Sequence, residues 1–263
     1  MKRILFFVFF MADFLFVSAQ TYNEWIDKSF ECIESEDWAG AEKALIGALR
    51  VQPANPQNAL LLSNLGTIQR KMGKNDEALK SYTNALMITP RSVTLLMNRA
   101  ALFSEMEKFD DALKDYNQVL MLDDKEEDAL YLRGLIRLEK NDTTACRKDF
   151  EQLLKINPKS SDARIGLAAL MKLRGYYTEA IDLYTQVIRV NPEQTSLYLN
   201  RGEAYLLNRR LNKADEDVAK ALELDPKDPL VYVLRAKLKL ARYEKEDASL
   251  DLDRAVLSKN NTL

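Results

Sequence analysis

Apolar residues recur along most of the chain at intervals of three and four, which is the spacing of one face of an α-helix. Residues 62–68 and residues 78–86 are two such runs. The polar stretch Met72-Gly73-Lys74-Asn75 separates them. The pattern predicts two helices joined by a short turn.

This pair of runs repeats every 34 residues in three columns. A small residue stands at Gly66, Ala100, Gly134, Ala168, Gly202 and Ala236. Twelve residues later come Ala78, Ala112, Cys146, Ala180, Ala214 and Ala248. Four further on is a large residue at Tyr82, Tyr116, Phe150, Tyr184, Val218 and Leu252. Small residues let helices approach and large ones fill the space that remains, so we expect the pairs to stack on one another.

Prolines mark the ends of the second runs, at Pro158, Pro192 and Pro226. Proline cannot continue a helix and moves the residue before it out of the helical region. The phase predicts seven units at about 22–55, 59–92, 93–126, 127–160, 161–194, 195–228 and 229–262. Three extra residues follow the first unit, within 54–58.

The columns resemble the tetratricopeptide repeat, a 34-residue helix-turn-helix unit with the signature W-x2-L-G-x2-Y, then A-x3-F, A and P. The best matches run from Leu65-Gly66 to Pro90 and from Arg201-Gly202 to Pro226. Asp124 in place of proline, Cys146 in place of alanine and Lys239 in place of an aromatic residue depart from it. The resemblance implies an all-α, right-handed α-solenoid of about seven units, with residues 20–263 in a single superhelix.

In this family the first helices line the concave face, and partner segments usually lie there. The resemblance therefore implies a partner-binding groove with these candidate residues: Met97, Tyr131, Leu135, Leu138, Ile165, Lys172, Leu199, Glu203, Leu206, Val233 and Lys237. Its second half is more apolar than an exposed surface requires, which is typical of a partner site. The alternative is that the superhelix buries these residues against neighbouring helices.

The composition excludes several classes of function. The 263 residues contain no histidine, which excludes His-based catalytic triads and His-ligated zinc. Thirty-eight basic and 40 acidic residues give a net charge of −2, without the basic field that nucleic acid requires. No phosphate loop, CxxC pair or calcium loop occurs. We expect no enzyme, no cofactor and no metal site, and we expect Cys32 and Cys146 to be buried free thiols three units apart.

Residues 1–19 have the layout of a secretory signal peptide. Lys2 and Arg3 precede an apolar run from Ile4 to Val17, and a small-residue exit follows at Ser18-Ala19. Asp13 inside the run is unusual, and a retained membrane anchor is the alternative. The expected location is the periplasm or the outer membrane, with secretion as a further possibility.

A non-enzymatic adaptor that binds a partner protein or peptide is the favoured function. A helical module for a glycan or lipid is the alternative. Asn64, Asn98 and Asn200 occupy the middle column of the carboxylate clamp that some family members use on chaperone tails, but the flanking columns do not match. That clamp is therefore absent. Leu250, Val256 and Leu257 are candidates for self-association through the C-terminal helix.

Overall fold

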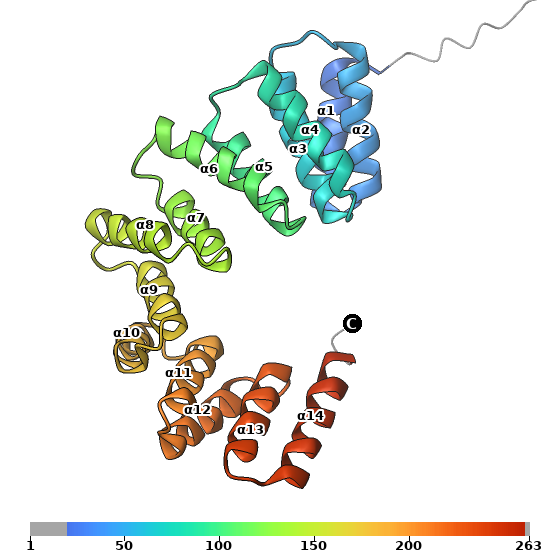
Figure 1. Ribbon diagram of the computed structural model, residues 1–263. Helices are drawn as coiled ribbons and strands as arrows, with labels where there is room; N and C mark the ends of the chain where they lie inside the picture. Colours follow the sequence, from blue (N-terminus) through green and yellow to red (C-terminus); the bar gives the residue numbers. More distant parts are fainter. Residues whose placement is uncertain (1–19, 261–263) are drawn as a thin grey trace, which may run out of the picture. The chain divides into compact units, whose positions relative to one another are not determined.

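The computed structural model describes residues 20–260, so the predicted signal peptide lies outside the described residues. Within 20–260 the chain contains fourteen helices and no strand (Figure 1). The helices are α1 Tyr22–Glu34, α2 Trp38–Val51, α3 Asn58–Lys71, α4 Asn75–Ile88, α5 Val93–Glu105, α6 Phe109–Leu122, α7 Glu127–Glu139, α8 Thr143–Ile156, α9 Ser161–Leu173, α10 Tyr177–Val190, α11 Thr195–Leu207, α12 Leu211–Leu224, α13 Pro229–Ala241 and α14 Lys245–Asn260.

Local sequence fixes where several helices begin. Thr21 Oγ1 accepts a hydrogen bond from the Glu24 amide at 3.3 Å, and the Glu24 carboxylate accepts one from the Thr21 amide at 2.7 Å. This reciprocal cap satisfies two donors that a helix start leaves unpaired. Asp142 caps α8 through a single hydrogen bond, and Pro229 begins α13, where its missing N–H costs nothing.

One residue of each turn between paired helices has a left-handed backbone. These residues are Glu36, Gly73, Glu107, Asn141, Gly175, Arg209 and Tyr243, with φ between 57° and 80°. Beyond the first turn they recur every 34 residues, in the same phase as the packing columns. Only two of the seven are glycine, the residue that adopts this conformation without a steric penalty.

The three columns meet in the core between the helices of each pair. Alanines of the second column are fully buried, and so are Tyr82, Phe150 and Tyr184 of the third. A Cβ atom on Gly134 or on Gly166 would lie 2.5 Å from the Phe150 ring, so both glycines are needed at that contact. These contacts confirm the predicted all-α helical-repeat solenoid of about seven pairs.

Some apolar residues at regular positions of the repeat are exposed. Ile88 and Val190, near the ends of second helices, are exposed. In the third column, Val218 on α12 is 3% exposed, whereas Leu252 on α14 is 45% exposed. The reason is that α13 packs on α12, while no described helix follows α14.

The chain divides into two compact units between Asn98 and Arg99, within α5. In the first unit, the extra residues between α2 and α3 are held by Asn58, whose amide donates to the carbonyls of Gln52 and Pro53 at 2.7 and 3.1 Å. The Tyr22 hydroxyl donates to Asn58 Oδ1 at 3.0 Å. The insertion is therefore an ordered part of the first unit.

Both cysteines are free thiols. Cys146 is fully buried, and burial raises the pKa of its thiol. Cys32 is only partly buried at the edge of the core of the first unit, so the prediction of two buried thiols holds for Cys146 alone.

Candidate functional site

Ten of the eleven candidate groove residues lie in the second unit, on α7, α9, α11 and α13. These are the first helices of four successive pairs. Direct contacts join α7 to α9 and α11 to α13, and an ion pair between Lys172 and Glu203 joins α9 to α11, so the four helices are linked in chain order. Met97 lies on α5 in the first unit and is partly buried.

The aromatic and aliphatic candidates on α7 and α9 pack into the core. Tyr131 lies against Phe150, with ring centroids 6.3 Å apart, and burial raises the pKa of its hydroxyl. Leu135 and Leu138 pack on the same cluster around Phe150. Ile165 packs on the core shared by α9 to α13. Packing, the alternative to an open groove, therefore accounts for much of the surface area of these side chains.

Four of the five candidates on α11 and α13 line a hollow of about 170 Å³. Leu199, Val233 and the exposed Leu230 form its apolar wall, and Glu203 and Lys237 stand at its charged side. Leu206 is partly buried against the core and does not line it. The hollow lies between two first helices that contact each other.

A second hollow, of about 580 Å³, lies between α7, α9 and α11. Leu138, Leu173 and Leu207 provide apolar surface, and Glu139 and Lys172 are among its polar residues. Glu203 lines this hollow as well as the first one. The two hollows therefore adjoin at one carboxylate.

Glu203 binds two lysines from neighbouring helices. Its Oε2 accepts from Lys172 Nζ on α9 at 2.6 Å, and its Oε1 accepts from Lys237 Nζ on α13 at 2.7 Å. Burial alone would raise the pKa of Glu203, but the two lysines outweigh it and hold that pKa below its usual value. The carboxylate is therefore ionised at neutral pH and ties three helices together.

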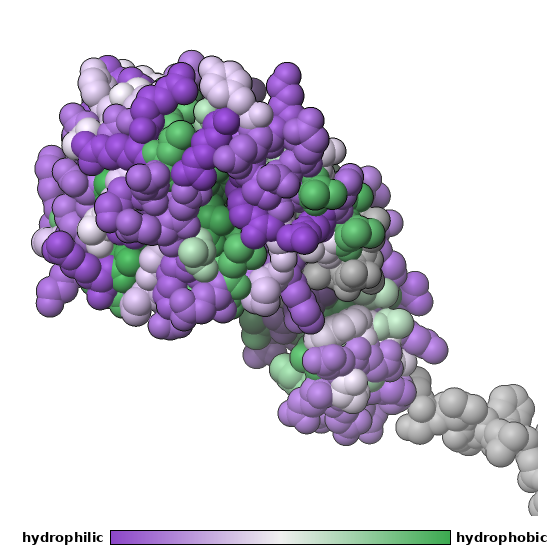
Figure 2. Space-filling model, turned by 90° about the horizontal axis from the view of Figure 1, so that it is seen from below, coloured by the Kyte–Doolittle hydropathy of each residue, from purple (hydrophilic) through white to green (hydrophobic). Residues whose placement is uncertain are grey.

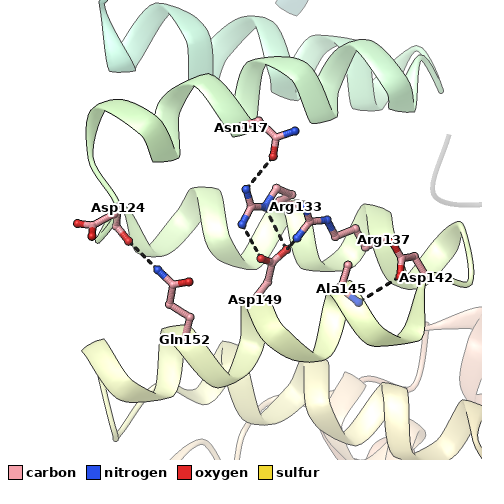
Figure 3. A network of polar contacts seen from close by, with 8 residues as sticks. All are labelled: Asn117, Asp124, Arg133, Arg137, Asp142, Ala145, Asp149 and Gln152. Carbon is pink, nitrogen blue, oxygen red and sulfur yellow. Dashed lines mark hydrogen bonds and ion pairs between the residues drawn. The ribbon is translucent and has the colours of Figure 1, made fainter.

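A column of buried ion pairs was missed at the level of sequence. An arginine on the first helix binds an aspartate sixteen residues later on the second in four pairs: Arg99–Asp115, Arg133–Asp149, Arg201–Asp217 and Arg235–Asp251. In Figure 3, Arg133 and Arg137 of α7 both point to Asp149 of α8, and Arg133 also reaches Asn117. The 34-residue phase of these arginines was the signal that could have revealed them.

The basic residues on α13 and at its C-terminal end form ion pairs within the protein. Arg235 and Lys239 bind Asp251, Lys237 binds Glu203, and Arg242 binds Asp215. This pairing places an acidic side chain next to each of these basic residues. It leaves Lys237, whose side chain is 51% exposed, as the cation at the edge of the first hollow.

The first unit has an apolar hollow of its own, of about 440 Å³. Ile26 and the exposed Phe30 of α1 line it together with the exposed Leu60 of α3. These residues occupy the groove columns by their phase, but they are not among the eleven candidates. The extra residues Pro56 and Gln57 also border this hollow.

Within residues 20–260 no group of three or more acidic or cysteine side chains is placed to hold a metal ion. No helix in that range is long and apolar enough to cross a membrane. Figure 2 shows one face of the molecule, on which hydrophobic patches lie between larger hydrophilic areas.

Family models for the tetratricopeptide repeat match residues 61–94, 128–160 and 173–238. The crystal structure of a tetratricopeptide repeat protein from Parabacteroides merdae is 40% identical, with a TM-score of 0.83. The alignment covers 90% of this chain and 93% of that one. The chain therefore belongs to the tetratricopeptide repeat family. Proteins of this family are generally non-catalytic modules of protein–protein interaction.

Two more distant structures share the fold alone. YrrB, described as a tetratricopeptide repeat protein with an unusual peptide-binding site, is 18% identical with a TM-score of 0.54. That alignment covers 73% of this chain and 97% of YrrB. PilF of Pseudomonas aeruginosa is 16% identical with a TM-score of 0.64, over 82% of this chain and 97% of PilF. A comparison with curated proteins finds no match.

Proposed function

We propose that this protein is a non-enzymatic adaptor of an exported compartment. An extended segment of a partner protein binds along α9, α11 and α13 of the second unit. The observation that carries this proposal is the pair of adjoining hollows on these first helices. Each hollow combines apolar walls with a charged border.

Exposed leucines support this choice of surface. Leu173 and Leu207 border the larger hollow and Leu230 borders the smaller one, and each is about half exposed or more. Apolar side chains gathered at a hollow and surrounded by charge are typical of a partner site. The peptide-binding site named for YrrB supports such a use of the fold.

The location rests on residues 1–19. Their positive start, apolar run and small-residue exit support export to the periplasm or to the outer membrane. The test is to determine the mass of the protein from its native host together with its cell fraction. A chain that starts at Gln20 in the periplasmic fraction supports the proposal, and an intact Met1 in the cytoplasm contradicts it.

Crosslinking in the native host, followed by capture of the mature chain, tests the partner surface. The informative variant is Leu173→Asp with Leu230→Asp, because both side chains are exposed and their loss spares the core. Met121→Asp on α6 is the matched control, since Met121 is exposed away from both hollows. Changes at Tyr131 or Leu135 would weaken the core instead.

We expect a partner that the wild type and the control capture and the double variant loses. A partner that the folded double variant retains would move the site elsewhere. A co-purifying glycan or lipid without any protein partner would favour the ligand-binding alternative.

A further inference from the structure

The ion cluster at Glu203 carries a net positive charge next to the smaller hollow. Lys172 and Lys237 each contribute one positive charge and Glu203 contributes one negative charge, which leaves +1. Since the carboxylate is ionised at neutral pH, this balance holds under physiological conditions. The cluster therefore attracts an anionic group.

The exposed donors of this cluster are on Lys237. An ammonium group has three N–H donors, and the hydrogen bond to Glu203 Oε1 uses one of those on Lys237. Lys172 is more buried, and it also approaches Asn200 Oδ1 at 3.4 Å. An incoming acceptor therefore reaches the ammonium of Lys237 first.

Aliphatic surface adjoins this ammonium directly. Lys237 lines the hollow of about 170 Å³ together with Leu199, Leu230 and Val233. A hollow of this size accommodates about one aliphatic side chain. On the far side of Glu203, the larger hollow is bordered by the acid Glu139, which repels a second carboxylate.

We propose that the partner segment carries an acidic residue next to an aliphatic one. The aliphatic side chain enters the hollow between α11 and α13, and the carboxylate binds Lys237. This inference rests on the proposed function, because it names the chemistry of the segment that the same face binds. It differs from the carboxylate clamp, whose columns this chain does not match.

The test starts from a displayed library of random twelve-residue peptides selected on the chain comprising residues 20–263. Selected peptides are synthesised, and their affinities are measured by fluorescence anisotropy at two salt concentrations. We expect an Asp or Glu next to Leu, Ile or Val. We also expect affinity to fall as salt rises, because screening weakens an exposed charge contact.

Three variants locate the contact. Lys237→Glu weakens binding about tenfold, and replacing the acid of the peptide by lysine restores it on this variant. Glu203→Gln tightens binding, because it raises the charge of the cluster from +1 to +2. The matched control is Lys148→Glu on α8, an exposed lysine outside both hollows, which leaves affinity unchanged. Circular dichroism checks that each variant folds.

The outcomes separate the two proposals. Peptides that lose affinity on Val233→Asp but not on Lys237→Glu would overturn the acidic chemistry and leave the partner face intact. Peptides whose affinity changes on neither Val233→Asp nor Lys237→Glu would overturn both the proposed partner face and the acidic chemistry of the segment. Selected peptides without an acidic residue would overturn the inference directly.

Discussion

Arg201 on α11 holds Asp217 on α12 through two parallel hydrogen bonds, Nε to Oδ2 at 2.9 Å and Nη2 to Oδ1 at 2.6 Å. Asp217 is buried, so water cannot replace the arginine if it is removed. In the pair α9–α10 the equivalent positions are Leu167 and Leu183. Equivalent positions of the repeat are thus occupied by an ion pair in one helix pair and by two leucines in another.

This comparison predicts a large difference between single and double replacements. Arg201→Leu leaves a buried carboxylate unpaired and lowers the free energy of unfolding by about 3–5 kcal/mol. Arg201→Leu with Asp217→Leu copies the α9–α10 pair, and we expect it to recover most of that loss. Urea unfolding of the three proteins measures this. A double variant as unstable as the single one would contradict the prediction.

The left-handed backbone of the turn residues predicts that adding a side chain at Gly175 destabilises the protein. Gly175 has φ 80° and open space where a Cβ would be added, so any cost of Gly175→Ala comes from the backbone. We expect a loss of about 1–2 kcal/mol in the free energy of unfolding. Arg209→Ala is the matched control, because Arg209 already has a Cβ at φ 60°. Equal effects of both changes in thermal unfolding would refute this account.

Gly134 and Phe150 predict a steric effect in the core. Gly134→Ala places a methyl group 2.5 Å from the Phe150 ring, and overpacking of this kind costs about 1–3 kcal/mol. A second change, Phe150→Leu, makes room for that methyl group. In a double-mutant cycle we therefore expect the two losses to sum to more than the loss of the double variant. Simple additivity would show that the contact relaxes without cost.

Glu203 predicts a pH dependence of stability. Its folded pKa lies below the usual 4.5, so its contribution is present above pH 4.5 and disappears as pH falls through the folded pKa. Because Lys237 is half exposed, we expect only about 1 kcal/mol from the pairs at pH 7. Wild type and Glu203→Gln are compared by urea unfolding at pH 7 and pH 3. A difference that is the same at both values would argue against an ionised Glu203 as the cause.

Self-association through α14 stays a prediction, and the structure supplies a variant for it. The predicted residues Leu250, Val256 and Leu257 are exposed on this helix, and so is Leu252. We expect a molar mass that rises with protein concentration in light scattering. Leu252→Lys with Val256→Lys would abolish that rise, because charge on this face opposes apolar contact. A wild-type protein that stays monomeric at high concentration would contradict self-association through α14.

The sequence by itself determined the helix pairs, their phase and their packing columns. These follow from local periodicity and residue size, so Ala78 and Tyr82 could be placed in the core without knowledge of other contacts. The arginine column of Arg201 recurs in four helix pairs and could have been found from its phase. Hydrophobic periodicity does not report this column, because its members are charged.

Only the tertiary structure decided which groove residues are open. Leu138 and Leu240 occupy the same column of the first helices, yet Leu138 packs on the cluster around Phe150 and Leu240 is 49% exposed. Burial depends on the helix that follows, and phase alone does not report it. Likewise, Glu203 meets Lys172 and Lys237 across 31 and 34 residues of sequence because stacking brings three helices together. A charge pattern on one helix cannot show a pair that forms between helices.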